Sequence, residues 1–331
     1  MTHDTSSDNQ SPTTADGVGI TVAIPTVRPT TVTATIESVL AQTHDNWELI
    51  VVMQGDDESL ARAVDDATAG DDRARGMWIP TKGLNRARNA AIRAARHDVI
   101  AFVDDDCEAA PTWLAEIVSA FADDPDVGVV AGTLVAPPAK RWPISVCPAV
   151  RPEDFVHRSE AGDADLPPGA DFAGANLVVT RDAWERVGYF DDELGPGSTF
   201  RGGCDIDFVL RALRVGVAVR FLPTAVVTHT SGRRYGVRSV LQLSTDYGRG
   251  QGAVAGKMSL ESTADAGSWN GAAWREGMWR QTFIEPFTRL RPQRFLRSLP
   301  RLLGFEREYR RCRREYELDE RGNLRASAGA S

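Results

Sequence analysis

Short apolar runs alternate with amphipathic segments through the first half of the chain. The apolar runs predict strands, which we place at Ile20–Ile24, Glu48–Met53, Gly76–Ile79, Val99–Val103 and Val127–Ala131. The segments between them have the apolar spacing of helices, which we place at Thr30–Gln42, Ser59–Ala69, Leu84–Ala95 and Pro111–Phe121. This alternation predicts an α/β fold in which a mostly parallel sheet is covered by helices on both faces.

The pattern changes in the second half. Residues 137–170 are rich in Pro, Asp and Ala, and we expect a loop or an insertion there. A second block then predicts, in order, the strand Asn176–Thr180, the helix Arg181–Val187, the turn Gly188–Gly197, the helix Ile206–Val215 and the strands Ala218–Leu222 and Ala225–His229. After Gly232 the pattern is helical to the end, with interruptions expected at Pro286, Pro292 and Pro300.

Three segments are therefore expected. Residues 1–18 form a Ser/Thr/Asp-rich disordered tail, which lacks the basic start and apolar core of a signal peptide. Residues 19–232 form the α/β domain, and residues 233–331 form a helical, Arg-rich extension. No apolar run approaches the roughly 20 residues of a membrane-spanning helix, so we predict a cytoplasmic protein.

Charge is distributed unevenly. The net charge of −8 argues against a general nucleic-acid binder. Residues 289–314 nevertheless contain ten Arg and two Glu, a net charge of +8. Apolar residues recur near them at helical spacing: Phe283, Phe287, Leu290, Phe295, Leu299, Leu302 and Leu303. Two interpretations stay open: a basic amphipathic surface for peripheral contact with anionic lipid, or a helical cap on the α/β domain with a solvated Arg face. The four scattered cysteines predict reduced thiols.

Three consecutive carboxylates, Asp104–Asp106, follow the apolar run Val99–Val103. Adjacent carboxylates repel one another, so such a cluster suggests that a cation binds there, and carboxylate oxygens suit a divalent metal. Helix capping is the alternative, but Pro111 is the natural first helical residue and the cluster lies about one turn too early. Pro25, Thr26, Arg28 and Gln54 also follow strands, so three strand ends converge on one crevice.

Six short motifs occur in a characteristic order. They are Val22-Ala23-Ile24-Pro25, Trp47-Glu48-Leu49-Ile50-Val51-Val52, Gly83-x-x-x-Ala87-Arg88-Asn89-x-Ala91, Phe102-Val103-Asp104-Asp105-Asp106, Gly174-x-Asn176 and Gly203-Cys204-Asp205-x-Asp207. With these motifs the chain, from about Ile20 to His229, resembles the family 2 glycosyltransferases of the GT-A fold. The resemblance implies a Rossmann-like three-layer αβα sandwich that binds a nucleotide-diphospho-sugar donor.

The resemblance also implies roles for the acidic cluster. Asp106 corresponds to the metal ligand of the family's D-x-D motif, and the metal would be Mn²⁺ or Mg²⁺. Asp104 would face the ribose and diphosphate of the donor, with Asp105 in support. His229, at the end of a predicted strand, corresponds to a second metal ligand in many members. The alternative for His229 is a hydrogen-bonded or exposed histidine at a strand end.

The catalytic base of the family falls in a Glu-Asp pair, and here Cys204 stands at the Glu position. Asp205 is therefore the candidate base, and Asp207 the second candidate. An N-cap role for Asp205 on the following helix is the alternative.

The remaining donor-binding candidates come from three other motifs. The resemblance places Arg88 toward the nucleotide, while a solvated Arg on an amphipathic helix is its alternative. Relatives often carry an Asp that reads the nucleobase where this chain has Met53 and Gln54, and a Gln amide can also pair with a base. Pro25, Thr26 and Arg28 complete the donor-binding set. Asp56 and Asp57 are expected to cap the next helix.

The resemblance thus predicts an inverting, metal-dependent glycosyltransferase acting on a hydroxyl of a glycan or lipid-linked glycan. A sugar-phosphate nucleotidylyltransferase is one alternative, although it needs a Gly-rich basic loop where this chain has Pro25-Thr26-Val27-Arg28-Pro29. An inactive glycan-binding or scaffold subunit is the other, because Cys204 and Met53 depart from the family pattern. Gly248-x-Gly250-x-Gly252 follows no predicted strand, so we exclude a dinucleotide fingerprint and expect close helix packing or a loop over the acceptor.

Overall fold

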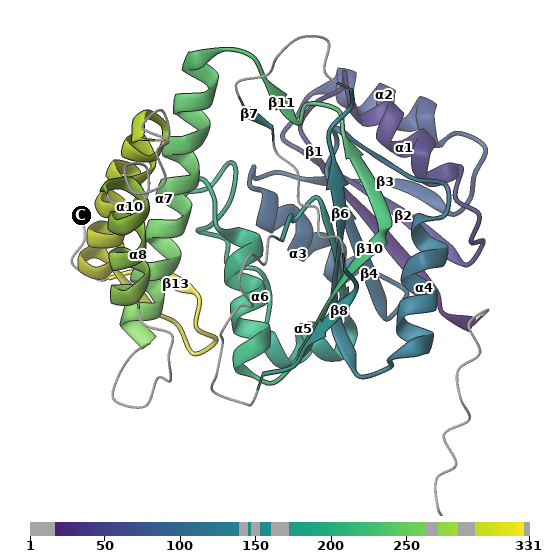
Figure 1. Cartoon of the computed structure of the whole chain (residues 1–331). Coiled ribbons are helices and arrows are strands. Elements are labelled where there is room, and N and C mark those ends of the chain that lie inside the picture. Colours follow the sequence, from purple (N-terminus) through teal and green to yellow (C-terminus); the bar gives the residue numbers. More distant parts are fainter. Residues whose placement is uncertain are drawn as a thin grey trace, which may run out of the picture.

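The computed structural model describes residues 17–138, 145–146, 153–159, 172–261, 271–283 and 295–327. Its centre is a nine-stranded sheet in the order β3-β2-β1-β4-β9-β6-β10-β5, and β8 also pairs with β10 (Figure 1). The strands are β1 (Ile20–Thr26), β2 (Trp47–Gln54), β3 (Ala74–Ile79), β4 (Val99–Val103), β5 (Cys107–Ala109), β6 (Val127–Val135), β8 (Phe155–His157), β9 (Asn176–Thr180) and β10 (Ala218–His229).

The sheet is mostly parallel, as the alternation predicted. β1 pairs in parallel with β2 and β4, β2 with β3, and β6 with β10. β9 lies antiparallel between β4 and β6. The parallel strands β1, β2 and β4 therefore end at one edge, and the residues that follow them meet there.

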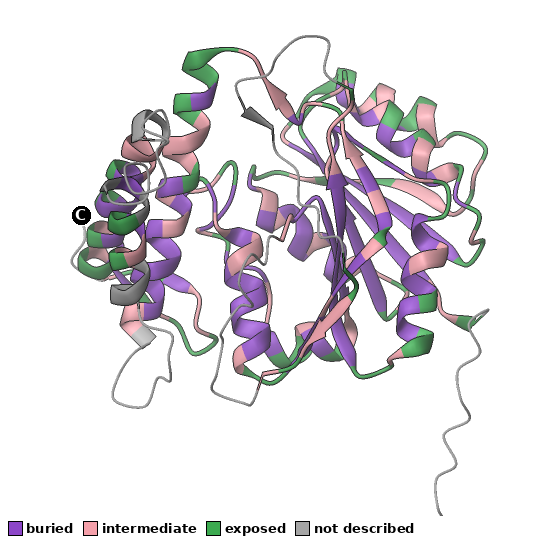
Figure 2. Cartoon of the chain, in the orientation of Figure 1, coloured by how far each residue is buried: buried purple, intermediate pink, exposed green. Residues whose placement is uncertain are grey.

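Helices cover both faces of the sheet, which confirms the predicted three-layer arrangement (Figure 1). On one face lie α1 (Val32–Leu40), α2 (Glu58–Thr68) and α4 (Trp113–Asp123), and on the other lie α3 (Leu84–Ala94), α5 (Arg181–Val187) and α6 (Cys204–Arg214). Val22 and Ile24 of β1 pack toward the first group, and Ala23 packs toward the second. Figure 2 shows the strands as an almost continuous buried layer. Burial on both faces explains why these strands are apolar throughout.

The C-terminal region lies outside α6 (Figure 1). It begins with β11 (Arg233–Arg234), which pairs with β7 (Ser145–Val146) from the middle of the chain. It continues with α7 (Val237–Glu261), α8 (Gly271–Phe283), α10 (Phe295–Glu315) and the hairpin β12 (Tyr316–Leu318)–β13 (Leu324–Ala326). One apolar cluster joins Leu194 and Phe200 to Val254 of α7, Cys312 of α10 and Leu324 of β13. The region therefore packs on the α/β domain through a shared core.

Two expectations for the C-terminal region were wrong. Pro300 lies inside α10 and does not interrupt it, because the extensive packing of α10 on α7 offsets the lost backbone hydrogen bond. The last part of the chain that the structure describes forms the β12–β13 hairpin and not a helix. Gly322 supplies the positive φ of +74° for its turn, and Leu324 is buried by the hairpin. Pro286 and Pro292 lie outside the described residues.

Other elements also differ from the prediction. The two strands expected between Ala218 and His229 form one strand, β10, with a register shift between Leu222 and Val226. Helix α4 begins at Trp113 after the N-cap Thr112, two residues later than expected. Strand β5 was not predicted, because three residues are too few to show a periodicity. No helix among the described residues has the length and apolar character needed to span a membrane.

The predicted tail at residues 1–18 and the predicted loop at residues 137–170 fall mostly outside the described residues. The boundaries of the three predicted segments stay predictions. Cys107, Cys204 and Cys312 are buried free thiols.

Candidate active site

The acid cluster, Asp104–Asp106, occupies the turn between β4 and β5. The Cys107 amide donates to the Asp104 carbonyl, and β5 then runs antiparallel to the end of β10, with Cys107 opposite His229. This pairing brings His229 Nε2 to 3.3 Å from Asp106 Oδ1. Thr230 also donates to the Asp106 carbonyl through its amide and its hydroxyl. The unpredicted strand β5 is thus what joins the acid cluster to His229.

Residues at the end of β1 and just after it also bind the acid cluster. The Thr26 hydroxyl donates to Asp105 Oδ2 over 2.7 Å. The Arg28 guanidinium binds both Asp105 and Asp106, with Nη1 3.1 Å from Asp106 Oδ2. Helix capping is not the role of the cluster, because the N-cap of α4 is Thr112. The ends of β1, β2 and β4 thus meet at one edge of the sheet, as predicted.

The three carboxylates differ in exposure and in pKa. Asp105 and Asp106 are buried, whereas the Asp104 side chain is 31% exposed. Desolvation raises the pKa of Asp104; the charge of Arg88 opposes this, and repulsion from Asp106 and Asp105 reinforces it. Burial would also raise the pKa of Asp106, but the hydrogen bond and charge of His229 and the charge of Arg28 outweigh it and hold that pKa well below its usual range. Asp106 is therefore ionised at neutral pH.

Asp106, Cys107 and His229 place possible ligand atoms within 4.8 Å of one another. Burial raises the pKa of the Cys107 thiol, so this sulfur stays protonated and is a poor ligand. Among the described residues, the buried Nδ1 of His229 has no hydrogen-bond partner. A carboxylate oxygen beside an imidazole nitrogen suits Mn²⁺, and Mg²⁺ through the oxygen. Asp106 and His229 therefore fit a divalent cation.

Arg88, on α3, is 1% exposed, so the alternative of a solvated Arg is wrong. Its Nη2 donates to the Gly174 carbonyl over 2.9 Å and lies 3.6 Å from Asp104 Oδ1, and its Nη1 lies 3.7 Å from Cys204 Sγ. A Cβ at Gly174 would lie 2.5 Å from Arg88 Nη2, so only glycine admits this approach. Arg88 is therefore a buried residue that contacts the acid cluster through Asp104.

Asp205 lies in the first turn of α6, whose N-cap is Gly203 with φ +81°. The N-cap alternative for Asp205 is therefore wrong. The Gly174 amide donates to Asp205 Oδ2 over 3.0 Å, and the Ile206 amide donates to Oδ1 over 2.9 Å. Contacts thus run from Asp104 through Arg88 and Gly174 to Asp205, so the candidate base and the acid cluster share one support.

Asp207 faces a different set of partners. Its carboxylate binds Arg211 Nε at 3.0 Å and Lys257 Nζ at 2.8 Å, with all three side chains buried. Both carboxylate oxygens are held by these cations, so Asp207 is better suited to a structural role than to proton transfer. Lys257 was missed by the sequence analysis. The only feature that marks it in the sequence is that lysine is rare, since the chain has only three Lys.

Two donor-binding candidates lie in the β1 and β2 strands. Gln54 is 5% exposed, and its amide oxygen accepts from the Gly83 amide over 2.7 Å. That oxygen is therefore engaged within the protein. Pro25 is buried within β1, opposite Val52 of β2. Asp57 caps α2 by accepting a hydrogen bond from the Ser59 amide, which confirms the capping prediction for Asp57; Asp56 lies one residue before the N-cap.

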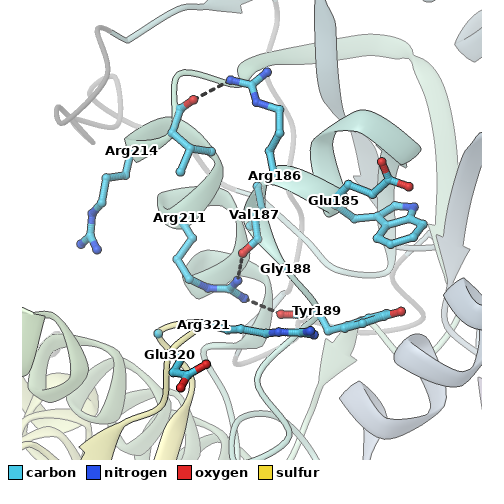
Figure 3. Close-up of a pocket in the computed structure, with 12 residues that line it drawn as sticks. Glu185, Arg186, Val187, Gly188, Tyr189, Arg211, Arg214, Glu320 and Arg321 are labelled. Atoms are coloured by element: carbon cyan, nitrogen blue, oxygen red, sulfur yellow. Dashed lines mark hydrogen bonds between the residues drawn. The ribbon is translucent and has the colours of Figure 1, made fainter.

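A cavity of about 600 Å³ lies elsewhere, at the end of α6 and beside the β12–β13 hairpin. Figure 3 shows Arg211 and Arg186 there donating to backbone carbonyls. The residues that line this cavity include Arg211 and Arg214 at the end of α6, whereas Asp205 lies in the first turn of that helix, which is about 16 Å long, and none of Asp104–Asp106 lines the cavity. The cavity is therefore separate from the acid cluster.

The fold and part of the sequence match known proteins. Over 165 residues (49% of this chain, 51% of the relative) it is 32% identical to a glucosyl-dolichyl phosphate glucuronosyltransferase of Haloferax volcanii. Over 149 residues (45% and 30%) it is 28% identical to a pre-mycofactocin glycosyltransferase of Mycobacterium tuberculosis. The chain thus spans about half or less of the length of these relatives.

A solved mannosyltransferase from Pyrobaculum calidifontis, in complex with GDP-Man and Mn²⁺, superposes with a TM-score of 0.58 at 16% identity, covering 87% of this chain and 86% of that one. This likeness shows the GT-A fold. Residues 21–185 match the sequence model described as glycosyl transferase family 2. These residues include the acid cluster, Arg88 and Gly174, and through them the chain belongs to glycosyl transferase family 2.

Proposed function

We propose that this protein is a metal-dependent, inverting glycosyltransferase. It moves a sugar from a nucleotide-diphosphate donor to a hydroxyl group of a glycan or a lipid-linked glycan. The observation that carries the proposal is the linked pair of acidic sites. The acid cluster lies at the carboxyl end of β4, where parallel sheets bind ligands, and Arg88 and Gly174 connect it to Asp205.

The acid cluster forms the donor side of the site. Asp106 and His229 would hold Mn²⁺ or Mg²⁺, which supplies Lewis-acid stabilisation of the charge that develops on the leaving diphosphate. Asp104, the most exposed of the three carboxylates, is oriented by Arg88 and would face the ribose. Asp105 holds Thr26 and Arg28 at the rim. The GDP-Man and Mn²⁺ bound by the Pyrobaculum enzyme support this assignment.

Asp205 forms the acceptor side. Its carboxylate accepts the proton of the acceptor hydroxyl as that oxygen bonds to the anomeric carbon of the donor sugar. The bond between the anomeric carbon and the phosphate oxygen breaks in the same step, and the nucleoside diphosphate leaves with that electron pair. A single displacement of this kind inverts the anomeric configuration. The two backbone amides that bind Asp205 fix its direction.

The acceptor class is supported by the Haloferax relative, whose name specifies a sugar on dolichyl phosphate. We infer a sugar linked to a lipid phosphate as the acceptor. Membrane contact through the C-terminal region stays a prediction. The described Arg side chains of α10 pair in part with Glu306, Glu308 and Glu315, as expected for a helical cap.

A panel of ADP, CDP, GDP, UDP and dTDP, each with and without Mn²⁺, tests the donor side by thermal shift. At least one should raise the unfolding midpoint only when Mn²⁺ is present. The matching nucleotide sugars should release nucleoside diphosphate slowly to water. A requirement for a nucleoside triphosphate and a sugar phosphate would point to a nucleotidylyltransferase, and binding without turnover would point to a glycan-binding subunit.

Asp205→Asn tests the acceptor side. We expect nucleotide affinity to change less than threefold and turnover to fall by roughly 10² to 10⁴, the usual contribution of a general base. Asp65→Asn, on the exposed face of α2, is the control and should retain wild-type turnover. Normal turnover in Asp205→Asn would remove Asp205 as the base.

A further inference from the structure

Helix α7 packs against two different partners. Gly248, Gly252 and Gly256 recur every four residues and face α10, where an added Cβ would lie 1.9 Å from the Arg301 carbonyl, 2.2 Å from the Phe305 carbonyl and 2.7 Å from Cys312 Cβ. Gly250 lies about 200° around the helix from both Gly248 and Gly252. The Gly-x-Gly-x-Gly motif therefore marks close packing on two sides of one helix.

Gly250 faces the residues that precede α6. A Cβ at Gly250 would lie 2.3 Å from the Gly202 carbonyl carbon and 2.6 Å from the Gly203 amide nitrogen. A Cβ at Gly203 would in turn lie 2.7 Å from Val254 Cγ2. The two backbones are thus in direct contact, and the contact lies two residues before Asp205.

Lys257 lies two turns after Gly250 and so on the same side of α7. Its ammonium group is buried, 2.8 Å from Asp191 Oδ2 and 2.8 Å from Asp207 Oδ1. Asp191 Oδ2 also accepts from the Leu324 amide of the C-terminal hairpin. We name Asp191, Asp207, Arg211 and Lys257 the Lys257 cluster. It joins α7, α6, the segment after α5 and β13.

A buried ion cluster of this kind adds little net stability, because desolvation offsets the attraction between its charges. Its directional bonds instead favour one arrangement of the elements that they join. Here they act on Asp207, which lies two residues after Asp205 in the first turns of α6. Gly250 and Lys257 therefore contact residues on either side of Asp205 in the sequence, Gly202–Gly203 before it and Asp207 after it.

We propose that Lys257 and Gly250 are positioning residues for glycosyl transfer: through them α7 fixes the start of α6 and hence the direction of the Asp205 carboxylate. The inference rests on the proposed function. It gives the C-terminal region a part in the reaction although no residue of α7 needs to touch the substrate. A displacement of about 1 Å of a reacting group can cost about 100-fold in rate.

The first test replaces Lys257. Lys257→Met should lower kcat for nucleotide-sugar hydrolysis by about 10- to 100-fold. It should change the affinity for the nucleoside diphosphate selected by the thermal-shift panel, with Mn²⁺, by less than threefold, because Asp104–Asp106 lie on another element. Lys257→Arg keeps the charge and should restore most of the lost kcat. Wild-type kcat in Lys257→Met, or an equal loss of nucleotide binding, would contradict the proposal.

The second test uses two matched glycines of α7. Gly250→Ala and Gly252→Ala place the same methyl group against backbone at 2.3 and 2.2 Å, the former toward α6 and the latter toward α10. Both should lower the unfolding midpoint, but only Gly250→Ala should lower kcat, by about tenfold or more at unchanged nucleotide affinity. Equal kcat values in the two variants would overturn the proposal.

These variants also separate the two levels of inference. If the wild-type protein neither binds a nucleotide with Mn²⁺ nor hydrolyses any nucleotide sugar, the proposed function fails. If the wild-type protein is active and the glycine pair behaves alike, only the positioning role fails. Should Lys257→Met not fold, the glycine pair decides the question.

Discussion

The acid cluster and the Lys257 cluster contain the same kinds of side chain but balance their charges differently. The Lys257 cluster sets two carboxylates against two cations, all of them buried, and their oxygens are occupied by internal donors. The acid cluster sets three carboxylates against Arg28 and Arg88, with the His229 imidazole beside Asp106, and Asp104 stays partly exposed. One cluster is closed, with its carboxylates and cations paired one to one, and the other is open, with more carboxylates than guanidinium groups.

This difference separates a structural role from a binding role. A closed cluster with paired charges has no unmet electrostatic demand, so it can only orient the elements that it joins. An open cluster with more carboxylates than guanidinium groups can accept a further cation, as the proposed metal site requires. Sequence reasoning placed Asp205 and Asp207 together as catalytic candidates, yet Asp207 belongs to the closed cluster and Asp205 is connected to the open one.

The largest expected effect comes from breaking the closed cluster. Asp207→Asn leaves Lys257 with Asp191 alone and Arg211 with only backbone carbonyls as hydrogen-bond partners. An uncompensated buried charge costs about 3 kcal/mol of unfolding free energy. Denaturant unfolding measures this loss. Mn²⁺ affinity should not change, because the acid cluster is untouched. A loss below about 1 kcal/mol would show that the cluster is not closed in the way described.

The stability lost in Asp207→Asn should also depend on pH. Burial would raise the pKa of Asp207, but Lys257 and Arg211 outweigh it and lower that pKa. Because the pKa of Asp207 is lower in the folded protein, its ionised carboxylate stabilises the fold at every pH above its unfolded-state pKa of about 3.9. This contribution to the free energy of unfolding is lost as the pH falls toward the folded-state pKa. The difference in stability between wild type and Asp207→Asn should therefore narrow below about pH 4. Asp182→Asn, an exposed control, should show no such change.

Removing a carboxylate from the acid cluster should weaken the binding of Mn²⁺ and nucleotide and leave the stability of the fold nearly unchanged. Asp106→Ala removes a metal ligand, and we expect Mn²⁺-dependent nucleotide affinity to fall about 100-fold or more by calorimetry. The unfolding midpoint should stay within about 3 °C, since repulsion among the carboxylates is relieved as the Arg28 and His229 contacts are lost. The exposed Asp126→Ala is the control. Unchanged nucleotide affinity in Asp106→Ala would refute the assignment.

The smallest effect concerns Arg28, which binds Asp105 and Asp106 where a metal ion would compete with it. Because its side chain is 46% exposed, its pairing is worth at most about 1 kcal/mol. Arg28→Gln should therefore raise the affinity for Mn²⁺ alone by about three- to fivefold, measured by calorimetry without nucleotide. Arg62→Gln on α2 should leave it unchanged. Weaker Mn²⁺ binding in Arg28→Gln would mean that Arg28 does not compete.

Several elements follow from local sequence. The apolar runs that became β1, β2 and β4 are buried on both faces, and burial of that kind leaves a continuous apolar pattern. Asp104–Asp106 follow one such run directly, so their place at the sheet edge needs only the strand and its direction. The Asp57 cap likewise depends on residues two positions apart. Such features are readable because their cause lies within a few residues.

Tertiary structure determined which side chains contact one another in the two clusters. The position of His229 beside Asp106 depends on β5, a strand too short to have a pattern of its own. Arg88 reads as a surface residue on its helix, but its burial depends on Gly174, 86 residues away. The same holds for Lys257, whose two carboxylates come from distant elements. Charge balance and burial are properties of contacts between distant segments, and a local window of sequence does not contain them.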